Sequence, residues 1–508
     1  MALLGQFDLQ QAVVIITGAS CVEDLSEEEI SRFQSLADHP LDLNRAARSR
    51  LLSSGLFSQY QVASIIDYRA RTGDILSWKE LALVDGFSEE LAQALRFFLV
   101  LDSNNAPGSK RSVRYGHTLT ARGSINTRAE MPYRVKYQGS LGDIAELYLT
   151  TPGTASAAYY GRKYLGKVVA GHFNARFGQG LLQWSGFNMT SLSTTAAFSR
   201  KSSGFSPTGA VGPDMLGIAT DWNIGSWSMG AAYSFTGNQA VVNLSRYWRR
   251  HTLGMTATMQ GASADWRFSL PATAICGEVA VDWKGQVKAL ASADYSPSYG
   301  SHVAMRINWQ GLDTKEWSDV HIGFSNKDLN AIVSAGMKKD SQQYKALLTY
   351  SPQHKAGNWI IKPGTRLQAR YRPQEKYPLR AEGRITMSAA LGRWEINGRY
   401  DYVLCAEGAH LGYIEGAFKN SSVNVYLRGG LFMIDKWDDR IYVYERDVPG
   451  SLNVPAYYGR GWNASLYSGW KINRNHSLWL RLEIIDYPWN LQPKQGKATA
   501  RLQYRWTI

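Results

Sequence analysis

The last twelve residues of the chain, Lys497 to Ile508, alternate strictly between apolar and polar side chains. Leu502 and Trp506 belong to the apolar set, and Arg501 and Arg505 belong to the polar set. Successive side chains of a β-strand point to opposite faces. The pattern therefore predicts a final strand with one apolar face and one cationic face.

The same alternation recurs over roughly the C-terminal 400 residues, with turn signals between the segments. In 394–404, 423–428 and 478–484, apolar side chains oppose Arg, Glu and Asn. This pattern is typical of an all-β transmembrane antiparallel barrel whose apolar face meets lipid, and we expect about 20 strands. A large soluble sandwich or propeller is the alternative. Tyr and Trp at the strand ends, charged residues on the opposite faces and the lack of a blade repeat argue against it.

The first hundred residues have a different pattern, with helical periodicity instead of alternation. Residues 23–40 read as an amphipathic helix with an acidic first turn, which suits the helix dipole. Helical runs continue to residue 103, and 104–112 (NNAPGSKRS) have the composition of a linker. We therefore predict a small all-α domain over 23–103, a linker over 104–112 and the barrel over 113–508.

Residues 1–22 contain a short apolar run followed by small residues and Cys21. This resembles the core of a signal peptide, but the basic residues that usually precede it are missing. We interpret 1–22 as the remnant of a leader segment. A lipid-acceptor role for Cys21 is the alternative.

Four segments of the helical region, 41–46, 65–69, 78–81 and 84–88, resemble the tandem helix–hairpin–helix module of competence DNA receptors. In that module, glycine hairpins bring backbone N–H groups close to DNA phosphates. Three of the four signature glycines are replaced here, and Gly86 is the one that remains. The resemblance implies nucleic-acid contacts at Arg45, Arg48, Arg50, Gly55, Arg69, Arg71 and Gly86. A solvated helix face is the alternative reading of the arginines.

The combination of such a module with a barrel also resembles a set of outer-membrane proteins of Bacteroidetes-type bacteria. The segment 171–184 (GHFNARFGQGLLQW) carries part of this resemblance. It implies a barrel in the outer membrane and a helical domain in the periplasm. The apolar end of the final strand is similar to the signal that the barrel assembly machinery reads, although Ile508 stands where Phe is usual.

The net charge of +14 is divided unevenly along the chain. Residues 1–100 hold 8 Lys and Arg against 14 Asp and Glu, whereas the remainder holds 48 against 28 and carries a charge of +20. The polar faces of the strands place much of this excess in the lumen. The expected basic surface comprises Arg366, Arg370, Arg372, Arg380, Arg384, Arg399, Arg428, Arg481, Arg501 and Arg505, with Arg134 and Lys136 on earlier strands. Such a lumen favours anions, whereas an Arg–Glu network that knits together a plugged barrel is the alternative.

The sequence offers little catalytic chemistry. It contains no G-x-S-x-G elbow, P-loop or H-E-x-x-H motif, and its three cysteines are too scattered for a metal or disulfide framework. Asp435, Asp438 and Asp439 have the spacing of calcium ligands, but a solvated acidic loop is the simpler interpretation. We expect no enzyme activity, no cofactor and no metal.

The expected function is the binding or passage of an anionic polymer, with DNA as one candidate, by a barrel surrounded by outer-membrane lipid. The alternative is a structural or assembly protein whose helical domain docks a periplasmic protein and plugs the barrel.

Overall fold

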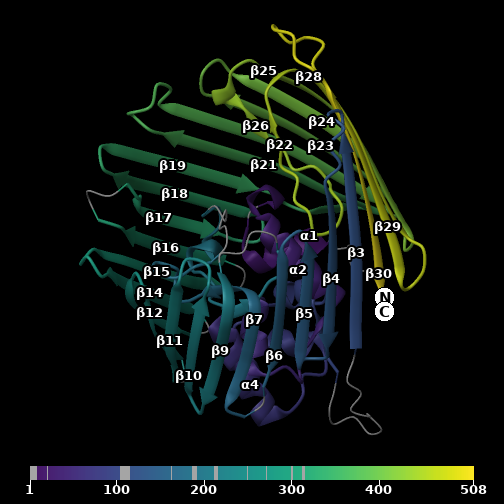
Figure 1. The fold of residues 1–508 in the computed structure, drawn as a ribbon. Coiled ribbons are helices and arrows are strands. Elements are labelled where there is room, and N and C mark those ends of the chain that lie inside the picture. The colour runs from purple at the N-terminus through teal and green to yellow at the C-terminus, as the bar shows by residue number, and fades with distance from the viewer. Residues whose placement is uncertain are drawn as a thin grey trace.

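The computed structural model describes residues 9–19, 21–102, 115–161, 163–185, 192–210, 215–248, 250–270, 272–298, 301–311 and 315–508. A wall of antiparallel strands closes on itself and surrounds a group of short helices from the N-terminal part of the chain (Figure 1). The predicted linker, 104–112, lies outside the described residues.

Within the described residues the barrel has 24 strands, each antiparallel to its neighbours. The first half consists of β3 (Tyr115–Asn126), β4 (Tyr133–Leu141), β5 (Ala145–Thr151), β6 (Thr154–Tyr160), β7 (Leu165–Arg176), β9 (Met215–Ile224), β10 (Trp227–Ser234), β11 (Gln239–Trp248), β12 (His251–Thr258), β13 (Gly261–Ser269), β14 (Thr273–Asp282) and β15 (Val287–Ser298). The second half consists of β16 (Ser301–Trp309), β17 (Ser318–Ser325), β18 (Leu329–Lys338), β19 (Ser341–Tyr350), β21 (Trp359–Tyr371), β22 (Leu379–Leu391), β23 (Trp394–Leu404), β24 (Ala409–Lys419), β25 (Val423–Ile434), β28 (Gly459–Lys471), β29 (His476–Asp486) and β30 (Lys497–Thr507).

The prediction of about 20 strands was too low. Strands such as β6 (TASAAYY) are short and rich in Ala, Ser and Thr, so apolar alternation marks them weakly. Two short pieces extend existing pairings and add no position to the wall. These are β8 (Gly204–Pro207), which pairs with the end of β7, and β20 (His354–Ala356), which continues β19 along β21.

The barrel closes between its first and last strands. β30 pairs with β29 on one side and with β3 on the other, where Thr118 lies opposite Thr507 and Asn126 lies opposite Thr499. The predicted final strand is therefore the one that closes the wall.

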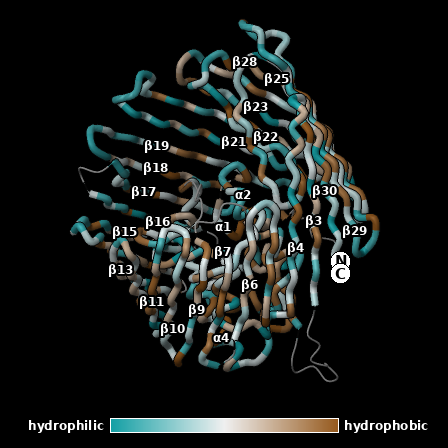
Figure 2. The backbone as a smooth tube through the Cα atoms, in the orientation of Figure 1, coloured by the Kyte–Doolittle hydropathy of each residue, from teal (hydrophilic) through white to brown (hydrophobic). Residues whose placement is uncertain are grey.

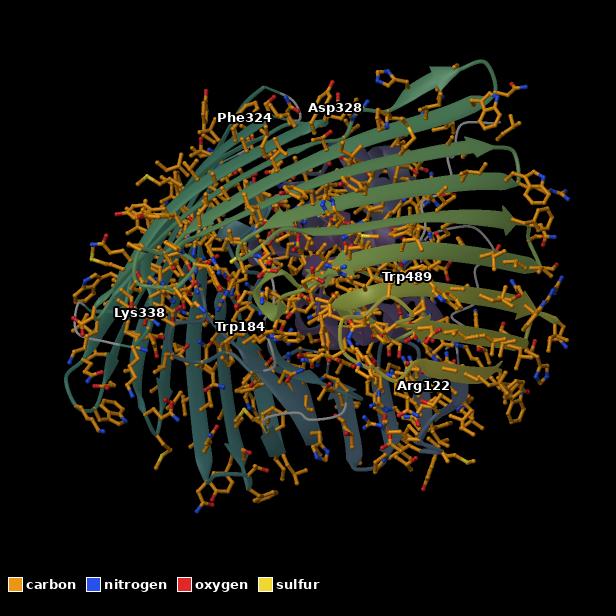
Figure 3. The ribbon with its side chains drawn as sticks, turned by 90° about the horizontal axis from the view of Figure 1, so that it is seen from above. Arg122, Trp184, Phe324, Asp328, Lys338 and Trp489 are labelled. Atoms are coloured by element: carbon orange, nitrogen blue, oxygen red, sulfur yellow. The ribbon has the colours of Figure 1, made fainter. Side chains whose placement is uncertain are left out.

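Most strands have an apolar outer face and a polar inner face, as the alternation predicted, but some inner positions, such as Val169 and Phe173 of β7 and Phe432 of β25, are apolar and buried. Leu427 is 63% exposed on the outside, whereas its neighbour Arg428 is 5% exposed on the inside. Figure 2 shows the resulting alternation of hydrophobic and hydrophilic positions along the wall, and Figure 3 shows side chains on both of its faces. In the described part of the chain, no helix is both long and apolar enough to cross a membrane.

The two ends of the barrel differ in their connections. At one end the strands are joined by short turns such as 142–144, 225–226 and 392–393, and the closing strand also finishes there. At the other end lie the longest connections, which run from β7 to β9, from β25 to β28 and from β29 to β30. We call these the short-turn end and the long-loop end.

The enclosed helices are α1 (Leu9–Thr17), α2 (Glu27–Asp38), α3 (Arg48–Ser54), α4 (Gln59–Thr72), α5 (Trp78–Leu83) and α6 (Glu89–Leu95). A 3₁₀ turn, η1 (Val22–Asp24), precedes α2, and β1 (Leu41–Asp42) pairs in parallel with β2 (Leu99–Val100). Capping boxes fix the starts of two helices, between Ser26 and Glu29 for α2 and between Ser58 and Gln61 for α4. We refer to residues 9–102, as far as they are described, as the plug segment.

The plug segment has a hydrophobic core of its own. Phe33, Phe57, Leu51, Ile65 and Phe98 are fully buried in one cluster, and every buried member of that cluster belongs to the plug segment. Ala12, Val13 and Ile16 of α1 are part of this core, so the described part of the expected leader packs with the helices. Whether it is cleaved stays a prediction. The wall surrounds the helices, which agrees with the alternative in which the helical domain plugs the barrel, whereas a periplasmic position of this domain stays a prediction.

Candidate functional site

Acidic residues of α2 form ion pairs with three separate parts of the wall. In the first turn, Glu28 lies 2.5 Å from Arg176 of β7, and Glu27 lies 3.4 Å from Arg134 of β4. At the other end of the helix, Asp38 lies 2.7 Å from Arg505 of β30. The Ser26 cap sets the start of the helix and thereby fixes where these carboxylates meet the wall.

A second contact lies around η1, where Glu23 is buried between Arg384 and Arg399. Burial by itself would raise the pKa of Glu23, but the two guanidinium groups outweigh it and lower that pKa below its ordinary value. Arg399 also binds Asp401 at 2.5 Å, so the network continues into the wall.

Cys21 and Asp24 share one wall residue, Arg366. Its guanidinium donates to Sγ of Cys21 at 2.8 Å and lies 3.7 Å from Asp24. Burial, together with the nearby Glu23 and Asp24, raises the pKa of the Cys21 thiol to about 12. The thiol that we considered as a lipid acceptor therefore lies against the lumen wall.

Helix α3 anchors the plug segment near the short-turn end. Arg50 forms a buried ion pair with Glu146 of β5 and donates to the Tyr160 hydroxyl at 3.1 Å. The Arg48 guanidinium lies 3.2 Å from the ring centroid of Tyr247. Two of the arginines that we predicted to contact nucleic acid thus face the wall in this structure.

The other five predicted nucleic-acid residues lie apart from this anchor. Arg45 pairs with Asp42 at 3.3 Å, and Arg69 donates to the carbonyl oxygens of Leu43 and Ala46. Arg71 forms an exposed pair with Asp67. Gly55 and Gly86 have positive φ values of 68° and 86° and lie against Arg32 and Tyr60. The structure therefore does not bring the seven residues together on one face, and DNA contact stays a prediction.

All ten arginines of the expected basic surface form ion pairs. Plug-segment acids pair with Arg366, Arg384, Arg399 and Arg505. Arg370, Arg372, Arg380 and Arg428 pair with Glu375, Glu382 and Glu415. Arg481 and Arg501 pair with Glu445 and Asp447. These pairs agree with the Arg–Glu network that we considered as the alternative. The alternation did not identify the partners in the plug segment and the inner loops, because those segments do not alternate.

Two connections from the long-loop end fold over the plug segment. In the first inner loop (177–185 and 192–210), Phe198 accepts a hydrogen bond from Arg306 of β16 through its carbonyl, and Ser193 donates to Asp24. In the second inner loop (435–458), Tyr444 contacts Gln10 and Glu23. The two loops thus also connect the plug segment to the wall.

The second inner loop contains its own 3₁₀ turn, η3 (Trp437–Asp439), and a small hairpin of β26 (Ile441–Tyr442) and β27 (Ala456–Tyr457). Glu445 lies 2.5 Å from Arg481. Burial and the neighbouring Glu483 nevertheless raise the pKa of Glu445 to about 8.

Two of the three aspartates considered as calcium ligands bind other groups of the protein. Asp439 accepts hydrogen bonds from the backbone N–H groups of Cys405, Ala406 and Glu407 at 2.8–2.9 Å, and Asp435 pairs with Arg460. Among the described residues there is no group of three or more His, Cys, Asp or Glu side chains placed to hold a metal ion.

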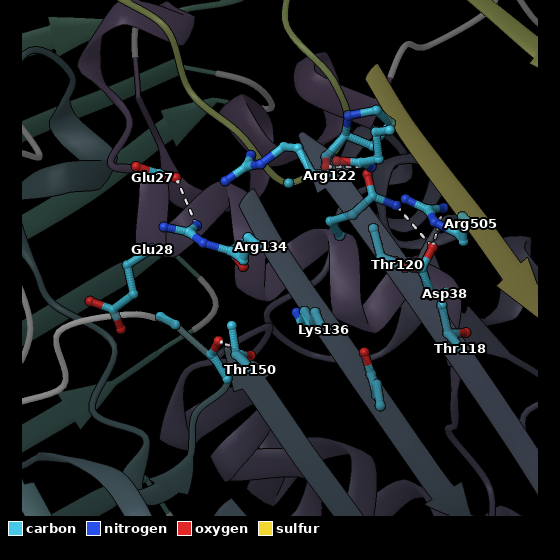
Figure 4. Close-up of a pocket in the computed structure, with 18 residues that line it drawn as sticks. Glu27, Glu28, Asp38, Thr118, Thr120, Arg122, Arg134, Lys136, Thr150 and Arg505 are labelled. Carbon is cyan, nitrogen blue, oxygen red and sulfur yellow. Dashed lines mark hydrogen bonds and ion pairs between the residues drawn. The ribbon is translucent and has the colours of Figure 1, made fainter. Parts of the chain in front are cut away.

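A polar cavity of about 120 Å³ lies between α2 and the wall around the closing seam. Its charged lining consists of Glu27, Glu28, Asp38, Arg122, Arg134, Lys136 and Arg505. Figure 4 shows these side chains from α2 and from strands β3, β4 and β30 gathered around the cavity. Two cations of this lining, Arg122 and Lys136, hydrogen-bond to hydroxyl groups, as described below.

Comparisons with solved structures return distant barrels. Pseudomonas aeruginosa OccK10 (OpdN) is 8% identical with a TM-score of 0.36, and the match covers 78% of this chain and 99% of that one. P. aeruginosa OprD is 9% identical with a TM-score of 0.36 (80% and 97% covered), and Acinetobacter baumannii OccAB4 is 5% identical with a TM-score of 0.35 (78% and 99% covered). No family model and no curated protein matches the sequence.

Proposed function

We propose that this chain is a non-enzymatic outer-membrane β-barrel that passes anionic solutes, and that the plug segment and the two inner loops close it at rest. The observation that carries the proposal is the set of ion pairs between plug-segment acids and lumen arginines. We also propose that the solute can be an anionic polymer, with DNA as one candidate.

The outer surface supports the membrane location. Large apolar side chains cover the outside of the wall, among them Ile414 at 68% and Ile385 at 61% exposure. Six exposed tryptophans lie toward the short-turn end of their strands, at Trp222, Trp227, Trp248, Trp359, Trp394 and Trp506, and others, such as Trp309, lie toward the long-loop end. An apolar band with an aromatic girdle, short turns at one end and long loops at the other are features of outer-membrane barrels, in which the short turns face the periplasm.

The plug segment has the properties of a removable unit. Its hydrophobic core is internal, and its contacts with the wall are mainly ion pairs and hydrogen bonds. Water can replace such contacts, whereas separating two apolar surfaces would expose them. The segment can therefore leave the lumen without exposing an apolar wall.

Removal of the plug segment would leave a cationic lumen. Arg366, Arg384 and Arg505 would lose the plug-segment acids that now pair with them. Fixed positive charge in a water-filled pore raises the local concentration of anions and lowers their barrier to passage.

The test is conductance across a planar bilayer under a KCl gradient, for the full chain and for a chain lacking the whole plug segment, residues 9–102. We expect low conductance from the full chain and a pore with chloride preference from the shortened chain. A shortened barrel that folds but does not conduct, or conducts without anion preference, would contradict the proposal. Adding single-stranded DNA to one side then tests the polymer: block or passage of current that weakens with salt supports it.

A structural role is the second candidate. Leu76, just before α5, and Leu83, the last residue of α5, are 65% and 83% exposed and offer an apolar contact for a periplasmic protein. This role predicts that neither the full nor the shortened chain conducts, and that substitution of Leu83 weakens capture of the partner.

A further inference from the structure

The cavity at the closing seam contains two cations without an acidic partner. Arg122 of β3 donates to Oγ of Ser451, and Nζ of Lys136 of β4 donates to Oγ of Ser35 at 2.5 Å. Among the described residues, neither side chain forms an ion pair with a carboxylate. A hydroxyl does not neutralise the charge of a guanidinium or ammonium group, and within the described residues Arg122 forms a hydrogen bond to Ser451 alone.

The acids that line the cavity are already committed elsewhere. Glu28 binds Arg176 at 2.5 Å, and Asp38 binds Arg505 at 2.7 Å. Glu27 is the exception, since its 3.4 Å contact with Arg134 is long and its side chain is 52% exposed. In addition, the buried Nε of Arg505 has no hydrogen-bond partner in the described residues.

These donors converge on a space that fits a small ion. A volume of about 120 Å³ is many times the ~10–15 Å³ that a single water requires. Arginine binds planar and tetrahedral oxyanions with two parallel N–H groups, and lysine adds a point charge. Figure 4 shows Arg122, Arg134 and Lys136 on two neighbouring strands of the cavity.

We propose that this cavity is a binding subsite for a small oxyanion, a phosphate or carboxylate group, held by Arg122, Lys136 and Arg134. The proposal rests on the channel function above and names the class of ligand that the lumen takes. The anion replaces the weak contact of Glu27 with Arg134. Binding therefore competes with one of the ion pairs that hold α2 against the wall.

The test is calorimetric titration of the full chain, folded in detergent at low ionic strength, with inorganic phosphate and separately with acetate. We expect saturable binding of at least one of the two anions. The double variant Arg122→Gln/Lys136→Gln should lose affinity at least tenfold. The matched control Arg474→Gln/Lys284→Gln, which removes the same charges from exposed turns, should keep it.

A variant that should strengthen anion binding distinguishes an effect on binding from an effect on folding. Glu27→Gln removes the competing carboxylate and should tighten anion binding, an effect that general damage to the barrel would not produce. The proposal is overturned if neither anion binds, if only a single-stranded oligonucleotide binds, or if the double variant and its control bind equally well.

Failure of the subsite and failure of the channel are distinguishable, because the titration uses the closed chain and requires no current. Anion binding together with a non-conducting shortened chain would support the subsite and contradict the transport function. Anion-selective current without phosphate or acetate binding would contradict the subsite and support the transport function.

Discussion

Asp38, the last residue of α2, lies 2.7 Å from Nη1 of Arg505 on the strand that closes the barrel, 467 residues later in the chain. β30 also forms the hydrogen-bonded seam with β3. The plug segment is therefore bound at the place where the wall closes, and the cationic face of the final strand has a specific partner.

Breaking this pair should loosen the plug segment. Asp38→Asn leaves Arg505 largely buried without its acid, since both side chains are only 12–13% exposed. Removing one partner of a buried pair costs about 3 kcal/mol, which corresponds to roughly a hundredfold increase in the open fraction of single channels in a bilayer. Asp67→Asn, which breaks the exposed pair with Arg71, is the control and should change the open fraction less than about threefold. Equal effects of the two variants would contradict this account of the contact.

The anchor at α3 predicts a local change in amide exchange. Glu146→Gln leaves Arg50 buried and charged beside Tyr160, and both members of the original pair are less than 10% exposed. We expect the amides of α3 to exchange at least tenfold faster in the full chain, because the free energy of local opening falls by about 3 kcal/mol. The amides of α5, whose residues form no hydrogen bond or ion pair with either member of this pair in the described part of the chain, should keep their rates. Unchanged exchange in α3 would show that the pair does not hold the helix.

The contact between the plug segment and the wall should weaken as the pH falls. The His39 ring nitrogens lie 2.8 Å from Oγ of Ser140 and 3.0 Å from Oγ1 of Thr118. Burial lowers the pKa of His39 from 6.5 to about 4, helped by the positive charges of Lys136 and Arg50 and opposed by Asp38.

The sign of the pH effect follows from proton uptake. Once α2 leaves the wall, the imidazole regains its ordinary pKa, so between pH 6.5 and 4 the detached state binds more protons than the docked state. Docking is therefore strongest above pH 6.5 and weakens as the pH falls toward 4, by up to about tenfold per pH unit. Glu23, whose pKa is lowered, loses its contribution only below its ordinary value of 4.5. Open probability measured from pH 7.5 to 4.5 should rise in the wild type and stay flatter in His39→Gln, and parallel curves would exclude His39 as the cause.

The membrane location predicts which leucine tolerates a charge. Leu427 lies near the middle of β25 and faces outward, whereas Leu491 is 75% exposed in the connection between β29 and β30. Leu427→Arg should destabilise the barrel in lipid by about 2–4 kcal/mol, whereas Leu491→Arg should be close to neutral. Urea titration of both variants in lipid vesicles measures the difference. A neutral Leu427→Arg would argue against a lipid-facing wall.

The sequence predicted individual strands well because the alternation is a local property. β25 and β30 fall where the apolar and polar positions placed them. The count failed at strands such as β6, because Ala, Ser and Thr fill a barrel wall without a strong contrast between its faces. Two strands can then be read as one, or as a loop.

The position of the helices inside the barrel could not be predicted from the local sequence pattern. Nothing in the sequence around Asp38 indicates that it meets Arg505, and Arg50 has the composition of an exposed helix face although it pairs with Glu146 inside the barrel. Only the opposed charges of the two parts of the chain, −6 and +20, pointed to an acidic segment inside a basic lumen. Charge complementarity between whole segments therefore carried the information that periodicity lacked.

A reversible tether tests most directly whether the plug segment gates the barrel. Ser49 of α3 accepts a hydrogen bond from Asn223 of β9 at 2.9 Å, and a Cβ atom placed on Gly166 of β7 would touch its Oγ. The variant Ser49→Cys/Gly166→Cys, with the three native cysteines changed to Ser, should form a disulfide between plug segment and wall. At pH 5 in a planar bilayer, we predict little current from the oxidised protein and anion-selective current after a reductant is added. Equal currents in the two redox states would contradict the claim that movement of the plug segment opens this barrel.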